Sequence, residues 1–253
     1  MKSRFLTPAH ISSGTPDIYA DKSALVLQWL LLVGIERRDF SLREVAADCR
    51  VGVSLGLVQR IFDYLVREGH IETVGFRTTK KFKLKTPSKL LTAWTKHYSL
   101  TNKCKIANYQ TTLGSREEVL DALKRSNLWK KTCLALHSAA ELHGCKNTNL
   151  QTIELYILDP SLRSQLEKKL QLQPQERGYD VLLITPYYKS VLNDRKQGTK
   201  LLPSAKLQAS PSHFFYSPSL LTYLDLFHFP LRGREQADFM AQKIPELRRI
   251  IRK

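Results

Sequence analysis

The stretch from residue 39 to residue 85 constrains the fold more than any other part of the chain. Ser41 is followed three residues later by Glu44, which is the capping-box pattern at the start of a helix. Ser54 is a second helix N-cap, and Gly69 is the kind of residue that commonly ends a helix. Two helices joined by a tight turn are therefore predicted in the first half of this stretch.

Two segments of alternating apolar and polar residues, 71–74 and 81–85, follow these helices and predict a β-hairpin. Basic side chains crowd its turn and second strand. A helix pair followed by a basic hairpin is typical of a winged helix-turn-helix, whose second helix enters the major groove of DNA. We therefore predict double-stranded DNA as the partner, with a neutral helix–hairpin scaffold as the alternative.

On the second helix, Val58, Ile61 or Phe62, and Leu65 recur at helical spacing, so this side is expected to face the core. The opposite side of its N-terminal half is then free to face base edges, while the hairpin reaches phosphates. The predicted DNA-binding residues are Ser54, Leu55, Gln59 and Arg60 on the helix and Arg77, Lys80, Lys81 and Lys83 in the hairpin.

Composition agrees with an anionic partner. The 253 residues carry a formal net charge of +17, and 42% of them are hydrophobic, as in a globular protein. The four cysteines show no disulfide-framework spacing, which favours the reducing cytoplasm. The most apolar run, residues 25–33, is too short to cross a bilayer. A cytoplasmic protein without membrane contact is expected.

The chain divides into three predicted parts. Residues 1–20 lack periodicity and are expected to be a flexible arm, and residues 21–98 are the DNA-binding domain. Its last helix begins near Thr86 and has an apolar face with Leu91 and Trp94. We interpret this face as a brace against the rest of the chain, and a homodimer contact is the alternative.

Residues 99–253 are predicted to form a mixed α/β domain, so the fold class is α+β. Segments 153–157 and 181–184 have the patterns of strands, and a helix pattern lies between them. The last helix is expected over residues 235–252, with a kink at Pro245. At most this domain resembles a nucleotidyltransferase without its catalytic carboxylates.

Catalytic and metal-binding patterns are weak. Cys133 and His137 have helical i, i+4 spacing, but a buried cysteine and a core histidine explain them better than a metal. Gly114-Ser115 is not followed by paired carboxylates on a strand, because segment 153–158 offers only Glu154. We therefore expect no enzyme activity, no cofactor and no metal. The alternative is an enzyme that acts on nucleic acid or nucleotides through the C-terminal domain.

Several segments resemble one family, and the most specific are 217–226 and 233–237. Together with 41–46, 52–54, 58–60, 87–94, 134–140 and 153–157, they are similar to the AbiEi-like antitoxins, transcriptional regulators of type IV toxin–antitoxin systems. The resemblance implies operator binding, autorepression and a cognate, nucleotidyltransferase-like toxin that is opposed without stable contact. The sequence departs from the family at residues 55–57, which are more apolar than a typical DNA-facing helix start.

Overall fold

The protein has an α+β fold, as expected from the sequence. The computed structural model describes residues 17–76, 80–186, 192, 196–197 and 214–253. The helices are α1 (Asp21–Leu32), α2 (Leu42–Ala47), α3 (Leu55–Arg67), α4 (Pro87–His97), α5 (Leu100–Lys103), α6 (Arg116–Arg125), α7 (Leu136–Leu142), α8 (Arg163–Lys169), α9 (Ser219–Phe227), α10 (Gly233–Lys243) and α11 (Pro245–Arg252). The strands are β1 (Ile71–Val74), β2 (Lys81–Leu84), β3 (Cys104–Thr111), β4 (Thr132–Leu134), β5 (Ile153–Ile157), β6 (Leu172–Gln175), β7 (Val181–Pro186), β8 (Lys196–Gln197) and β9 (Phe215–Tyr216).

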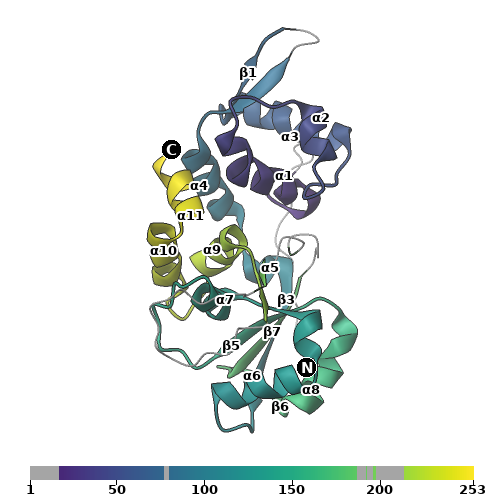
Figure 1. Cartoon of the computed structure of the whole chain (residues 1–253), viewed down its shortest axis with the longest axis vertical. Coiled ribbons are helices and arrows are strands. Elements are labelled where there is room, and N and C mark those ends of the chain that lie inside the picture. The colour runs from purple at the N-terminus through teal and green to yellow at the C-terminus, as the bar shows by residue number, and fades with distance from the viewer. Residues whose placement is uncertain (1–16, 77–79, 187–191, 193–195, 198–213) are drawn as a thin grey trace, which may run out of the picture.

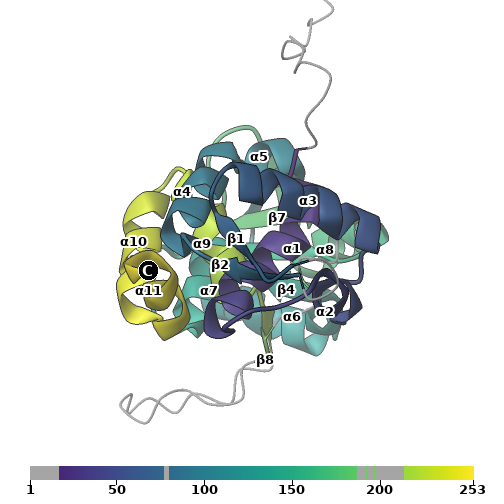
Figure 2. The same ribbon diagram turned by 90° about the horizontal axis from the view of Figure 1, so that it is seen from above.

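The three helices α1 to α3 and the hairpin β1–β2 form one end of the molecule, called here the N-terminal unit (Figure 1). Helix α1 is buried on most of its circumference, as expected of a helix packed on several sides. It contacts α3 within the unit and α11 from the end of the chain. The hairpin projects beyond these helices, and a view from above shows α3 and both hairpin strands at this end (Figure 2).

A mixed sheet forms the opposite end. Within the described residues its strand order is β6-β3-β7-β5-β4-β9-β8. Strands β5 and β7 pair in parallel at its centre, and β3 pairs antiparallel with β7. The continuous apolar segment of β7 is buried on both sides of the sheet, as its sequence predicted. Helices α6 and α8 cover one face, and α7 packs on the other (Figure 1).

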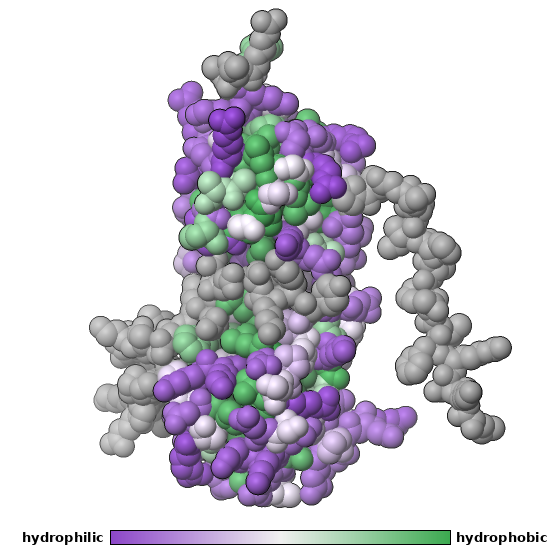
Figure 3. All heavy atoms as spheres, turned by 90° about the vertical axis from the view of Figure 1, so that its right-hand side faces the viewer, coloured by the Kyte–Doolittle hydropathy of each residue, from purple (hydrophilic) through white to green (hydrophobic). Residues whose placement is uncertain are grey.

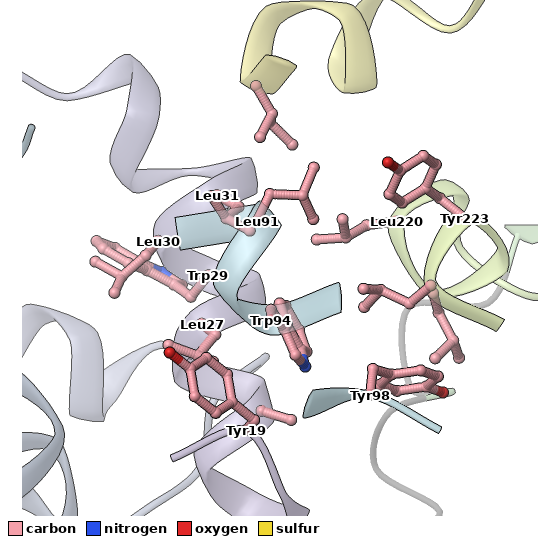
Figure 4. Packing of buried hydrophobic residues seen from close by; sticks show 14 of the residues in the cluster. Tyr19, Leu27, Trp29, Leu30, Leu31, Leu91, Trp94, Tyr98, Leu220 and Tyr223 are labelled. Carbon is pink, nitrogen blue, oxygen red and sulfur yellow. The ribbon is translucent and has the colours of Figure 1, made fainter. Parts of the chain in front are cut away.

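Helix α4 lies between the two ends. Its Leu91 and Trp94 are packed between side chains of α1 and the residues Leu220 and Tyr223 of α9 (Figure 4). Helix α11 also packs against α4, so the end of the chain returns to the N-terminal unit. One hydrophobic core consequently includes residues from both sides of position 98, and the boundary placed there stays a prediction.

Three local predictions were wrong. Cys133 lies in strand β4 and not on the helix of His137, so the two residues do not share a helical face. Pro245 does not kink one long helix, because Ile244 is extended and Pro245 begins α11 at its first turn. The predicted flexible arm is too long at its C-terminal end, where Ile18 and Tyr19 are buried.

The buried end of the predicted arm has a local cause. Asp17 accepts a hydrogen bond from the backbone N–H of Tyr19 at 2.9 Å, which turns the chain into α1. The Tyr19 ring then stacks on His97 with centroids 4.6 Å apart. Residues 1–16 of the predicted arm lie outside the described residues. In the part of the chain that is described, no helix is long and apolar enough to cross a membrane.

Candidate nucleic-acid interface

The start of α2 has both hydrogen bonds of the predicted capping box. The Ser41 hydroxyl accepts from the Glu44 N–H at 3.2 Å, and the Glu44 carboxylate accepts from the Ser41 N–H at 2.5 Å. These bonds to Ser41 hold the pKa of Glu44 below its ordinary value. The entry into α2 is therefore determined by residues that lie next to each other in the sequence.

The turn from α2 to α3 is held by Asp48, which the sequence analysis missed. Its carboxylate accepts a hydrogen bond from Trp29 Nε1 on α1 at 2.8 Å and is paired with the Arg50 guanidinium at 2.7 Å. The hydrogen bonds from Arg50 lower the pKa of this carboxyl well below its usual range. Gly52 then reverses the chain with φ of +54°. Asp48 thereby links the turn to α1 and also joins two residues within the turn.

Helix α3 begins and ends as predicted. The Ser54 hydroxyl accepts from the Leu57 N–H at 3.3 Å. At the other end Gly69 has φ of +72°, and the N–H groups of Gly69 and His70 reach back to Val66 and Leu65, the two bonds of a Schellman motif. The residues predicted to face the core are fully buried, namely Val58, Ile61, Phe62 and Leu65.

The outward side of α3 contains the residues predicted to contact DNA. Leu55 is 44% exposed, and Arg60 is exposed with no ion-pair or hydrogen-bond partner among the residues that the structure describes. Gln59 is half-buried and donates from Nε2 to Asp63 at 2.7 Å. This bond orients the Gln59 amide and leaves its oxygen as an acceptor on the surface of the helix.

The hairpin lysines have partners within the protein. Lys81 pairs with Asp39 at 2.7 Å, and this bond raises the lysine pKa. Lys83 lies 3.6 Å from Glu72, its antiparallel neighbour on β1. Lys80 is exposed, and its ammonium lies 5.3 Å from the centre of the Phe82 ring. The predicted Arg77 lies outside the described residues.

A backbone bridge fixes the hairpin relative to α2 and α3. Phe40 and Phe82 exchange two backbone hydrogen bonds, at 2.9 and 2.8 Å. Both rings are buried, and Phe62 of α3 lies edge-on between them. The predicted residues of α3 and of the hairpin are consequently held at the same end of the molecule by a shared aromatic core.

The surface of the N-terminal unit carries hydrophilic and apolar areas. On the face shown in Figure 3, the apolar area in the upper half lies below the hairpin and is bordered by hydrophilic side chains. A shallow hollow of about 20 Å³ between α1 and Arg50 is lined by Leu25, Leu32 and Val33. Exposed apolar side chains also occur at the end that carries α3 and the hairpin, namely Leu55, Val66, Val74 and Phe76.

Glu154, the carboxylate considered for an enzyme site in the sequence, makes hydrogen bonds inside the fold. Glu154 is fully buried on β5 and accepts hydrogen bonds from the backbone N–H and hydroxyl of Ser138 at 2.9 and 2.7 Å, and from Thr152 at 2.6 Å. It thus occupies the N-terminal end of α7. No group of three or more histidine, cysteine, aspartate or glutamate side chains within the described residues could hold a metal ion.

A second buried carboxylate joins the C-terminal end of α4 to the sheet. Asp225 of α9 accepts from the hydroxyls of Tyr98, which follows α4, at 2.5 Å and of Tyr156 in β5 at 2.8 Å. Burial raises the pKa of Asp225 to about 7, although the two tyrosine hydrogen bonds act in the opposite direction. Because Asp225 is 1% exposed, it is a structural residue of this junction.

A comparison with protein-family models identifies the chain. Residues 83–245 match the model described as a transcriptional regulator, the AbiEi antitoxin of type IV toxin–antitoxin systems. The chain belongs to the AbiEi antitoxin family. Searches of the curated proteins and of the solved structures found no match.

The family match places some of the residues above in context. It includes α9 and α10 with Asp225, and it begins within β2, so α1 to α3 lie outside it. In α10, the buried Gln236 accepts from the Asn147 N–H at 3.2 Å and donates to the Cys145 carbonyl at 2.5 Å. The segments that resemble AbiEi antitoxins most specifically therefore contribute contacts inside the fold.

Proposed function

We propose that this AbiEi family member is a sequence-specific DNA-binding regulator that represses its own operon and is the antitoxin of a cognate toxin. Residues 21–98 act as a winged helix-turn-helix in which α3 enters the major groove and the hairpin is the wing. The observation that supports this most is that α3, which carries the exposed Arg60, and the hairpin, which carries the exposed lysines, lie at one end of the molecule (Figure 2). The net charge of +17 favours the same polyanionic partner.

Helix α3 and the hairpin contact different parts of the DNA in this proposal. Arg60 has the length and the donors to bind guanine O6 and N7, while the Gln59 oxygen can accept from an exocyclic amine. Leu55, one turn before Gln59 on the same face of the helix, suits a thymine methyl group. The hairpin lysines approach phosphates, where charge and reach matter more than base complementarity. Asp39 and Glu72 hold two of these lysines in place before DNA binds.

The proposal is tested by binding of the purified protein to its own upstream DNA in competition with random duplex. Selective binding to the upstream DNA supports it, and equal affinity for both DNAs contradicts sequence-specific regulation. Growth with and without the neighbouring toxin gene tests the antitoxin role. That the protein has no enzyme activity stays an expectation from the sequence, and a homodimer contact through the apolar face of α4 stays the alternative to the brace.

Replacing Arg60 with alanine should weaken binding to the operator more than binding to random duplex. The difference should be about 1–3 kcal/mol if the guanidinium contacts a guanine with two hydrogen bonds. Competition binding at one salt concentration measures it. Arg67→Ala is the matched control, because Arg67 lies in the last turn of the same helix and packs against Tyr64. Equal losses on both DNAs would make Arg60 a phosphate contact.

Removing lysines from the wing should change the salt dependence of binding. In the Lys80→Ala/Lys81→Ala variant, the slope of log affinity against log salt should fall by about two, because each phosphate contact contributes roughly 0.9. The control is Lys168→Ala/Lys169→Ala on α8, at the opposite end of the molecule (Figure 1). A wild-type slope in the wing variant would mean that these lysines do not contact DNA. Arg77 and Lys83 remain further predicted phosphate contacts.

A further inference from the structure

The hairpin ends in an exposed aromatic side chain. Phe76 is 88% exposed, whereas the next most exposed large hydrophobic side chain in the described part of the chain, Leu231, is 47% exposed. Phe76 directly follows Gly75, whose φ of +81° turns the chain out of β1. A side chain this exposed lies outside the folded core.

Backbone hydrogen bonds fix the base of the hairpin that carries Phe76. Four residue pairs join β1 to β2, from Ile71 opposite Leu84 to Val74 opposite Lys81. The buried Phe82 ties β2 to Phe40 through two backbone hydrogen bonds. The strand that leads to Phe76 is therefore held rigidly, and the hairpin strands extend beyond the helices of the N-terminal unit (Figure 1).

The surroundings of Phe76 identify the kind of partner. Lys80 and Lys81 are exposed on the same hairpin, so a negatively charged surface is favoured there. An aromatic ring does not pair with a phosphate, but it can stack on the face of a base. DNA offers both groups close together, because a base step that opens towards the minor groove exposes base faces between two rows of phosphates.

We propose that Phe76 enters the minor groove of bound DNA and stacks against a base step next to the site read by α3. This inference rests on the proposed DNA-binding function. Apolar side chains that enter the minor groove partly unstack the bases and bend the duplex, and stacking depends little on sequence. The wing thus contributes affinity and DNA bending, while α3 contributes sequence recognition.

A fluorine label at the tip tests the stacking directly. The protein contains three tryptophans, so the Phe76→Trp variant labelled with 5-fluorotryptophan has one additional ¹⁹F signal. Addition of a random-sequence duplex should shift this signal through the ring currents of the bases. The same measurement on Leu231→Trp, an exposed site away from the hairpin, is the control. An unchanged Phe76→Trp signal in a protein whose DNA binding is verified by gel shift overturns the proposal.

The Phe76→Ala variant provides the second measurement. Its affinity for duplex should fall roughly tenfold, the size of one aromatic–base stack. The DNA bend measured by fluorescence energy transfer should decrease, and the salt slope should stay unchanged because no charge is lost. Circular dichroism should match the wild type, since Phe76 is exposed.

The outcomes separate this inference from the proposed function. If the wild type binds no duplex, both are wrong. If the wild type binds and Phe76→Ala binds and bends DNA equally well, only the stacking is wrong. If instead Phe76→Ala lowers self-association in sedimentation without DNA and leaves DNA binding unchanged, Phe76 serves a contact between copies, which also overturns the stacking.

Discussion

The Asp225→Asn variant should be more stable than the wild type at pH 8 and no more stable than it at pH 4. Asp225 is fully buried between two tyrosine hydroxyls, and burial raises its pKa from 3.8 to about 7. The wild type has its full stability at a pH below the unfolded-state pKa of Asp225. It loses stability as the pH rises through the folded-state pKa, because the buried carboxyl must then ionise. At about 1.36 kcal/mol per pKa unit, the shift from 3.8 to about 7 corresponds to a loss of roughly 4 kcal/mol once the pH exceeds the folded-state pKa.

The difference in the pH dependence of unfolding between the wild type and Asp225→Asn reports on the ionisation of Asp225 alone. Urea unfolding from pH 4 to pH 8 should give a free energy of unfolding that falls with pH more in the wild type than in Asp225→Asn. Asparagine keeps one acceptor and one donor for Tyr98 and Tyr156 but cannot ionise. Tyr156→Phe, which removes one stabilising hydrogen bond from the carboxylate, should raise the Asp225 pKa further. Parallel pH curves for wild type and Asp225→Asn would contradict the assignment.

Replacing Gly233 with alanine should destabilise the protein by about 3 kcal/mol, the upper range for an overpacked site. A Cβ at this position would lie 2.5 Å from the Leu226 carbonyl oxygen and 2.9 Å from the Phe229 Cβ. The carbonyl belongs to the backbone of α9, so the clash cannot be removed by rotating a side chain. The expected readout is a Tm lower by roughly 6–12 °C in calorimetry.

Gly56 supplies the matched control for this substitution. It also lies in a helix, α3, but a Cβ added there meets nothing within 4 Å. Gly56→Ala should therefore stabilise the protein by about 0.5–1 kcal/mol through the higher helix propensity of alanine. If Gly233→Ala were as stable as Gly56→Ala, the close approach of α9 and α10 would not be rigid.

The sequence by itself determined the parts of the N-terminal unit that depend on neighbouring residues. Ser41 with Glu44, Ser54, and Gly69 set the ends of α2 and α3, because caps join groups only two to five residues apart. The inward side of α3 followed from helical spacing in the same way. Strand β5 was predictable because Ile153, Leu155 and Ile157 alternate along it, and β7 because its apolar segment is uninterrupted.

Tertiary structure decided the features that join distant residues. Short segments such as 132–134 have no periodicity long enough to identify a strand, so Cys133 entered β4 only because β5 lies beside it. Pro245 is compatible both with a kink and with a helix start, and packing of α11 on α4 selects the start.

Contacts between distant residues also escaped the sequence analysis at the candidate nucleic-acid interface and around Asp225. The Lys81–Asp39 pair spans 42 residues, and the Tyr98–Asp225 hydrogen bond spans 127. No local pattern indicates such pairs, because their energies arise only when folding brings the groups together and removes water from them. The sequence therefore determined which residues α3 and the hairpin expose, and tertiary structure determined which of them have partners inside the protein.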